Sequence, residues 1–204
     1  RHVDRMNRQG AKVDYISIAS PNYLHDAHIR FALKNGSNAI CEKPLVLNPY
    51  ALQSLKELEK ETNKKVYAIL QLRLHPSIIK GDHAKSGGIA TNIGIHFFDM
   101  LLWIFGDVKN SYVEFHNDIK AKGHLTLSKA EVEWSLSIDR NDLPTNEWRP
   151  DRSITIDGKE LEFSEGFTSL HTESYKKILA GEGFGIEDAE PSLKLIHQIR
   201  NSKT

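Results

Sequence analysis

Cysteine is almost missing from this chain, and so are long apolar runs. The one cysteine, Cys41, excludes an internal disulfide bond and is typical of a reducing compartment. No stretch approaches the roughly 20 apolar residues that a membrane-spanning helix needs, and residues 1–10 are too polar for a secretory signal. We therefore expect a cytoplasmic protein without a membrane partner.

An excess of charge of either sign is also missing. The 204 residues contain 27 Lys and Arg against 27 Asp and Glu, so the formal net charge is zero. Lysines and glutamates alternate in segments such as 56–60, a pattern that is typical of a solvated helix face. Nucleic acid is therefore not an expected partner. The 39% of hydrophobic residues favours a globular fold with a sizeable core.

The first third of the chain predicts strands that alternate with helices. Short apolar runs rich in β-branched residues, at 13–19, 39–41 and 66–72, are typical of buried parallel strands. Apolar residues at helical spacing predict helices at 24–33 and 48–60, the second with Asn48 as its cap and Pro49 at its first position. This order predicts an α/β fold with part of a doubly wound parallel sheet.

The pattern changes beyond residue 76. A helix is expected from about 90 to 105, followed by five short strands and two closing helices. The strands are expected at 113–115, 123–127, 131–138, 153–156 and 160–163, and the helices at 172–179 and 189–200. We expect an α+β domain with an open, mostly antiparallel sheet. The glycines between 181 and 185 do not follow a buried strand, so we expect a loop there and not a phosphate-binding turn.

Three turns follow the three parallel strands, and ligands of open α/β sheets bind beyond the carboxyl ends of the strands. These turns are 20–22 with His25, 42–44, and 71–75. A proline ring restricts the residue before it, so Pro44 can aim the Lys43 ammonium into the crevice. The alternative is that Lys43 is a surface lysine beside a turn.

The helix after Gly87-Gly88 is apolar nearly all round and must be buried. Asn92, His96 and Asp99 nevertheless share one of its faces, and buried polar groups require partners. Three interpretations of His96 stay open: a core histidine hydrogen-bonded to Asp99, a metal ligand, or a general base that a carboxylate orients. A metal is the least favoured, because further ligands at a suitable spacing are not evident, and we expect no metal site.

Four motifs in sequence resemble the glucose-fructose oxidoreductase/inositol dehydrogenase family. They are Ala19-Ser20-Pro21-Asn22-Tyr23-Leu24-His25, Cys41-Glu42-Lys43-Pro44-Leu45, Gly87-Gly88 with Asn92-Ile93-Gly94-Ile95-His96-Phe97-Phe98-Asp99, and Glu187-Asp188-Ala189 before a helix. Each motif alone is weak, but their order and spacing are specific and cover most of the chain. The chain is most similar to the branch that acts on nucleotide-linked hexuronates in bacterial surface-polysaccharide (O-antigen) synthesis.

The resemblance implies a function and a set of site residues. It implies NAD-dependent oxidation of the C3 hydroxyl of a UDP-linked N-acetylglucosaminuronate, with Lys43 and His96 as the catalytic pair and Asn92 beside them. It also implies that Asn22, His25 and Glu42 line the nicotinamide ribose. The strand-end positions add Ser20, Pro21, Lys43 and Gln71 as cofactor contacts, and Arg73, Lys85, Asn92 and His96 are candidates for binding the substrate.

The resemblance also divides the chain and shows departures from the family. Residues 1–76 would be a partial, Rossmann-like dinucleotide-binding domain, and 77–204 a domain for substrate binding and homo-oligomerisation. The family's first strand, Gly-rich turn and helix are absent from this sequence, and the chain is short near 80–81. We therefore expect the chain alone to bind NAD poorly. Asn92 stands where many relatives carry aspartate. A dehydrogenase for another sugar or polyol, or a non-catalytic oligomerising fragment, are the alternatives.

Overall fold

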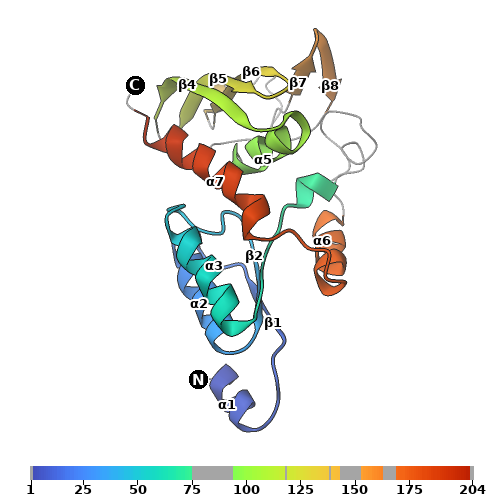
Figure 1. Ribbon diagram of the computed structural model, residues 1–204. Coiled ribbons are helices and arrows are strands. Elements are labelled where there is room, and N and C mark those ends of the chain that lie inside the picture. Colours follow the sequence, from blue (N-terminus) through green and yellow to red (C-terminus); the bar gives the residue numbers. More distant parts are fainter. Residues whose placement is uncertain are drawn as a thin grey trace.

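A parallel three-stranded sheet forms the first half of the fold (Figure 1). The computed structural model describes residues 2–74, 94–117, 119–137, 139–142, 153–162 and 169–202. After the short helix α1 (His2–Arg8), the strands β1 (Tyr15–Ile18), β2 (Asn38–Cys41) and β3 (Val66–Ala68) pair in that order. Ile16 lies opposite Ala39, and Ala39 lies opposite Val66. The parallel pairing of these strands is the one that the sequence predicts.

Helices α2 (His25–Lys34) and α3 (Ala51–Thr62) connect the parallel strands. A single 3-10 turn (Asn22–Leu24) precedes α2. Three leucines at helical spacing, Leu52, Leu55 and Leu58, are buried on one face of α3. The predicted first helical position, Pro49, is wrong by two residues, because α3 begins at Ala51. Asn48 accepts hydrogen bonds from the Tyr50 and Ala51 amides, so 48–50 form a turn before the helix begins.

The third strand is shorter than the sequence predicts. β3 ends at Ala68, and a 3-10 turn, η2 (Gln71–Leu74), follows it. Ile69 and Leu70 are buried, but burial alone does not give a strand its pairing partners. On the far side of β3, the Ala68 amide donates to the Phe184 carbonyl, which belongs to the glycine-containing loop after residue 180. That loop therefore lies against the edge of the parallel sheet.

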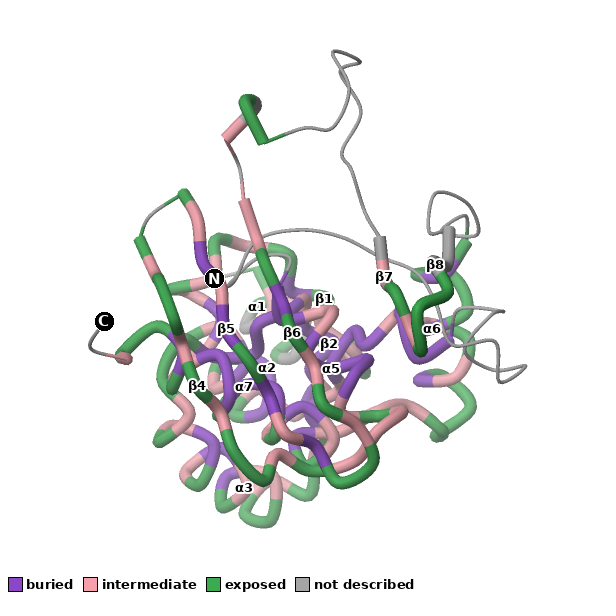
Figure 2. Tube along the Cα trace, turned by 90° about the horizontal axis from the view of Figure 1, so that it is seen from above, coloured by how far each residue is buried: buried purple, intermediate pink, exposed green. Residues whose placement is uncertain are grey.

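The second half contains an antiparallel sheet of β4 (Val108–His116), β5 (Lys120–Leu127) and β6 (Glu131–Ser137). A hairpin of β7 (Ser153–Ile156) and β8 (Lys159–Glu162) turns at Asp157 and Gly158, both with positive φ. Buried positions alternate with less buried ones along β5, so one face of the sheet covers the core (Figure 2). Gly123 is required in β5, because a Cβ there would lie 2.3 Å from the Tyr112 carbonyl oxygen.

Helices α5 (Gly94–Phe105) and α7 (Ile186–Arg200) connect the two halves of the fold, and α6 (Leu170–Leu179) packs beside the first half. The helix α5 lies beneath the antiparallel sheet, where Phe98 meets Trp134 edge to face. From the end of the chain, α6 packs against η2. The long helix α7 runs between the sheets and contacts α5, β3 and α3 (Figure 1). The predicted α/β fold with an antiparallel second sheet is confirmed, whereas a domain boundary at residue 76 stays a prediction.

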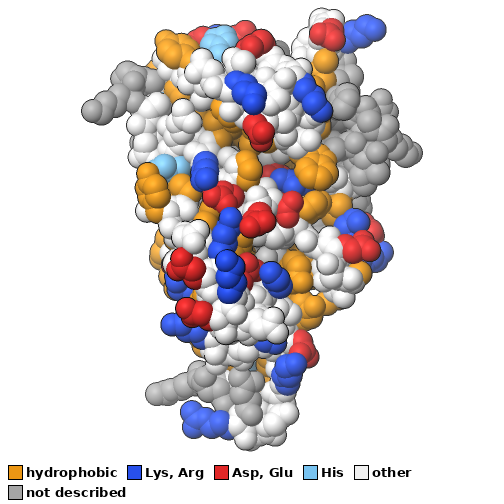
Figure 3. All heavy atoms as spheres, in the orientation of Figure 1, with side chains coloured by type: hydrophobic (Ala, Val, Ile, Leu, Met, Phe, Trp, Pro, Cys, Tyr) orange, Lys and Arg blue, Asp and Glu red, His pale blue; other side chains and the backbone are white. Residues whose placement is uncertain are grey.

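Acidic and basic side chains are interspersed over the face of the molecule that Figure 3 shows. Many of them are paired, as in Lys56 with Glu190 (2.7 Å) and Lys194 with Glu190 (2.7 Å). Among the described residues, no helix combines the length and the apolar composition that crossing a membrane demands.

Candidate functional site

The first two strand-end turns frame one cavity. Its volume is about 530 Å³, and it opens at the carboxyl ends of β1 and β2. The lining residues are Ala19, Ser20, Pro21, Asn22, His25, Glu42 and Lys43. The turns come together because the parallel sheet brings the ends of neighbouring strands to one edge. All the site residues predicted in these two turns therefore line the same cavity.

Lys43 is a buried lysine, with only 6% of its surface exposed. Its Nζ atom lies 3.4 Å from Asp99 Oδ1 and 3.5 Å from the Ile95 carbonyl oxygen, both on α5. Burial lowers the pKa of Lys43 to about 8, with Arg73 adding to the shift and Asp99 opposing it. The alternative of a surface lysine beside a turn is wrong.

Asp99 is the centre of a buried ionic network. Its carboxylate accepts two hydrogen bonds of 3.0 Å from the Arg73 guanidinium and one of 3.1 Å from Ser192. Burial alone would raise the pKa of Asp99, but Lys43 and Arg73, with the Ser192 hydroxyl, lower it below its ordinary value. Asp99 is therefore an anion that fixes the position of the Lys43 ammonium.

His96 lies on α5 beside this network and is partly exposed. Burial lowers its pKa to about 3, and the Lys43 and His171 charges act in the same direction. Lys43 Nζ lies 3.5 Å from the carbonyl oxygen of Ile95, the residue before His96, so the two residues are neighbours. Within the described ranges, the Asp99 carboxylate binds Arg73, Lys43 and Ser192, with no hydrogen bond to the His96 ring. The proposed histidine–carboxylate pairing is therefore replaced by an arginine–carboxylate pair.

Arg73 has a structural position and not the substrate-facing one expected from the sequence. Its guanidinium also donates to the Asp188 carbonyl oxygen at 2.7 Å and lies 4.5 Å from the centre of the Trp103 ring. The side chain is buried and ties η2 to α5 and α7. Sequence reasoning missed this role because the partners are 26 and 115 residues away along the chain.

The remaining cofactor candidates differ in what they can offer a ligand. Both ring nitrogens of His25 lie at hydrogen-bond distance from backbone carbonyl oxygens, so neither nitrogen is available to a cofactor. Glu42 pairs with His171 of α6, at 3.1 Å. His171 was not singled out in the sequence, where it stands 129 residues from Glu42 without a motif around it. Of the other candidates, Asn92, Lys85 and Gly87-Gly88 lie outside the described residues.

Gln71 fits a ligand that carries a hydrogen-bond donor. Its side-chain oxygen is buried and has no partner among the described residues, and buried acceptors normally have one. The residue begins η2, just past the end of β3 and beside the strand that leads to Lys43. The primary amide of a nicotinamide carries N–H donors, and such a donor would satisfy the Gln71 side-chain oxygen. The residues present therefore fit the nicotinamide end of a dinucleotide.

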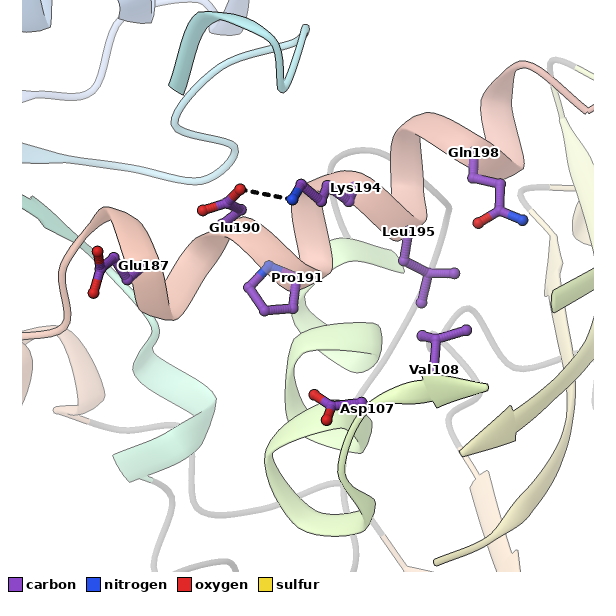
Figure 4. Close-up of a pocket in the computed structure, with 8 residues that line it drawn as sticks. All are labelled: Asp107, Val108, Glu187, Glu190, Pro191, Lys194, Leu195 and Gln198. Carbon is purple, nitrogen blue, oxygen red and sulfur yellow. Dashed lines mark ion pairs between the residues drawn. The ribbon is translucent and has the colours of Figure 1, made fainter. Parts of the chain in front are cut away.

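A second hollow, of about 410 Å³, lies between α7 and the start of β4 (Figure 4). Glu187, Glu190 and Lys194 line it, together with apolar Val108 and Leu195. The Glu190 carboxylate is held by Lys194 and Lys56, which lower its pKa. Glu190 and Lys194 are thus paired with each other, and the lining residues of this hollow include neither a histidine nor a buried lysine.

Known families match both halves of the chain. Residues 1–69 match the oxidoreductase family with an NAD-binding Rossmann fold, and residues 79–126 match the C-terminal α/β domain of the same oxidoreductase family. The WlbA (WbpB) dehydrogenase from Thermus thermophilus, solved with NAD and α-ketoglutarate, is 43% identical, with a TM-score of 0.90 over 99% of this chain and 77% of that one. This chain belongs to the glucose-fructose oxidoreductase/inositol dehydrogenase family.

Two further structures extend the comparison. The Thermus thermophilus WlbA dehydrogenase in complex with NAD and UDP-GlcNAcA is 40% identical, with a TM-score of 0.90 over 99% of this chain and 76% of that one. The WlbA dehydrogenase from Bordetella pertussis, with NADH and UDP-GlcNAcA, shares the fold at 18% identity and a TM-score of 0.71, over 98% and 79% of the two chains. The family membership that the motifs predict is confirmed.

Proposed function

We propose that this oxidoreductase uses NAD to oxidise the C3 hydroxyl of UDP-linked N-acetylglucosaminuronate. The observation that carries the proposal is Lys43, a residue that lines the strand-end cavity and whose buried amine has a pKa lowered to about 8. A buried amine of this kind is suited to proton transfer near neutral pH. The substrate class is supported by the 40% identical relative, which was solved with NAD and UDP-GlcNAcA.

Lys43 is the group best suited to take the hydroxyl proton. General bases act most effectively when their pKa lies near the working pH, and a pKa of about 8 leaves part of the amine neutral there. The Asp99 carboxylate, 3.4 Å away, then stabilises the ammonium that forms. Arg73 holds that carboxylate in place through two hydrogen bonds.

His96 acts as a neutral hydrogen-bonding group in this proposal. A pKa lowered to about 3 keeps the ring uncharged over the physiological range and makes it a weak base. A neutral imidazole offers one donor and one acceptor, so it can orient a sugar hydroxyl toward the Lys43 amine. We propose that Asn92 holds a neighbouring hydroxyl and that Lys85 meets an anionic part of the substrate.

Bound NAD supplies the hydride acceptor. We propose that Ser20, Pro21, Asn22, Glu42 and Gln71 hold its nicotinamide end. Support for this comes from the shared cavity for the first four and from the buried Gln71 oxygen, which has no partner among the described residues. We place the reaction in the cytoplasmic synthesis of bacterial surface polysaccharide, carried out by a homo-oligomer, on the basis of the family likeness.

The test compares substrates with the full-length protein. NADH formation is followed by its absorbance with UDP-N-acetylglucosaminuronate, UDP-N-acetylglucosamine and myo-inositol, each with and without α-ketoglutarate as an oxidant of NADH. Of the three compounds, we expect only UDP-N-acetylglucosaminuronate to reduce NAD. Turnover of myo-inositol, or equal turnover of the two UDP-sugars, would reject the substrate assignment while leaving the family assignment in place.

A further inference from the structure

Ser192 is a serine on α7 that has two acceptors for one proton. The residue is completely buried, at 0% exposure. Its Oγ atom lies 3.0 Å from the carbonyl oxygen of Ala189, three residues earlier in the helix, and 3.1 Å from Asp99 Oδ1 on α5. A hydroxyl group carries a single proton, so it can donate fully to only one of these oxygens at a time.

Asp99 Oδ1 is the oxygen on which three donors converge. Arg73 Nη2 lies 3.0 Å from it, Ser192 Oγ 3.1 Å and Lys43 Nζ 3.4 Å. A carboxylate oxygen has about two lone-pair sites, and Arg73 and Ser192 can fill them at the shorter distances. The Lys43 amine is therefore the most distant of the three donors and shares its acceptor with the Ser192 hydroxyl.

This shared acceptor bears on the charge of Lys43. Burial disfavours the Lys43 ammonium, and Asp99 is the carboxylate that favours it. A Ser192 proton on Oδ1 takes part of the capacity of that oxygen, so the ammonium gains less from Asp99. When the ammonium forms, the Ala189 carbonyl offers the hydroxyl another acceptor, so the buried Ser192 donor keeps a partner.

The other charged and titratable groups near Lys43 and Asp99 come from several elements. They are His25 on α2, Glu42 after β2, Arg73 on η2, His96 on α5, His171 on α6 and Asp188 on α7. A substitution of Ser192 keeps all of them. A change in the charge of Lys43 can therefore be traced to the Ser192 hydroxyl.

We propose that Ser192 is a positioning residue that competes with the Lys43 ammonium for Asp99 Oδ1 and so favours the neutral, proton-accepting amine. Ser192 is buried and is not one of the residues that line the strand-end cavity, so it acts through Asp99 and not by touching a ligand. The catalytic consequence rests on the proposed function, whereas the effect on the charge of Lys43 does not.

The first test measures the charge of Lys43 in the chain itself. Protein labelled with ¹³C at the lysine Cε atom is titrated from neutral to alkaline pH by NMR, and the Lys43 signal is assigned by its loss in Lys43→Met. We expect Ser192→Ala to raise the pKa of Lys43 by about half a unit to one unit, because Oδ1 then has room for the ammonium. An unchanged or lowered pKa in Ser192→Ala would overturn the proposal.

Two further variants separate the hydrogen bond from packing. Ser192→Cys fills the same place with a thiol, which is a weak donor, so it should raise the pKa of Lys43 about as much as Ser192→Ala does. The matched control is Ser174→Ala on α6, because Ser174 is 4% exposed and its hydroxyl donates within its own helix, to the Leu170 carbonyl at 3.0 Å. This control should leave the Lys43 titration unchanged. A wild-type titration in Ser192→Cys, or an equal shift in Ser174→Ala, would assign the effect to packing and contradict the proposal.

In the full-length enzyme, Ser192→Ala should move the rising limb of the pH profile of kcat to higher pH by the same amount as the Lys43 titration. The rate at pH 7 should fall about three- to tenfold and recover above the limb, with the KM for the sugar little changed, because the substrate contacts remain. A loss that persists at high pH would show general damage to the site and contradict the positioning role. A wild-type protein that oxidises no nucleotide sugar would remove the proposed function, and the Lys43 titration would still decide the role of Ser192.

Discussion

Removing the Arg73 guanidinium tests the buried network that surrounds Lys43. The change Arg73→Met keeps much of the side-chain length and deletes the charge. It removes both 3.0 Å hydrogen bonds to Asp99, the 2.7 Å bond to the Asp188 carbonyl and the contact with the Trp103 ring. Asp99 is 2% exposed, so its carboxylate then stays in the interior with Lys43 and Ser192 as its partners.

Two effects of Arg73→Met can be measured: a loss of folding stability and a rise in the pKa of Lys43. Breaking a buried ion pair by removing one partner destabilises a protein by about 3–5 kcal/mol, and we expect a loss in that range for Arg73→Met in urea unfolding. The Arg73 charge also lowers the pKa of Lys43, so its removal should raise that pKa and move the pH profile of activity to higher pH. Arg73→Lys keeps a positive charge without the forked geometry, so it should be less destabilised and shift the profile less.

The matched control is Arg30→Met on the surface of α2. Arg30 also forms a two-bond contact with a carboxylate, Asp26, at 3.0 and 3.1 Å, but the two side chains are 32% and 40% exposed. Exposed pairs of this kind contribute about 0–1 kcal/mol, so the control should lose little stability. If Arg73→Met loses no more than Arg30→Met, and its pH profile is unchanged, the reasoning about the network is refuted.

Three further predictions concern the site histidines and Lys43. Activity should rise with pH along a limb near pH 8, because the neutral fraction of Lys43 grows about tenfold between pH 7 and pH 9; a flat profile over that range would contradict the base role. His96 takes up a proton below about pH 6.5 in the unfolded chain but only near pH 3 in the folded chain, so acid favours unfolding. Between pH 7 and pH 4, the wild type should therefore lose roughly 2–3 kcal/mol more stability in urea titrations than His96→Gln. Equal losses would refute this. His171→Ala should leave the melting temperature nearly unchanged, since the pair with Glu42 is exposed, but weaken NADH binding about three- to tenfold by calorimetry if Glu42 holds the ribose; unaltered binding would separate this pair from the site.

Local chemistry in the sequence predicted the strand-end turns well. The βαβ pattern, Pro44 after Lys43, and the apolar helix with His96 are each encoded within a few residues, and the parallel sheet brings the turns together. Element boundaries were less certain where a turn imitates a helix start, as at Asn48, or where burial continues past the last strand pair, as after Ala68.

Partners that are far apart in the sequence could not be predicted from local patterns. Two of the three interpretations of His96 paired its ring with a carboxylate such as Asp99, three residues away, but Asp99 binds Arg73 and Lys43, which belong to other elements. The same is true of His171, which reaches Glu42 only because α6 returns to the η2 side of the parallel sheet. From the sequence, an arginine near a strand end is equally compatible with a structural role and with binding a substrate anion. Only the packing of α5 and α7 around Arg73 decides between these two roles.

The central claim is that the Lys43 amine takes the proton of the sugar hydroxyl. The most direct measurement is the single-turnover rate of NAD reduction by UDP-N-acetylglucosaminuronate in the full-length protein, compared with Lys43→Met. General-base catalysis contributes about a hundredfold to ten-thousandfold, so we predict a loss of at least a hundredfold with NADH affinity retained. A Lys43→Met protein that reduces NAD within a few-fold of the wild-type rate would contradict the account.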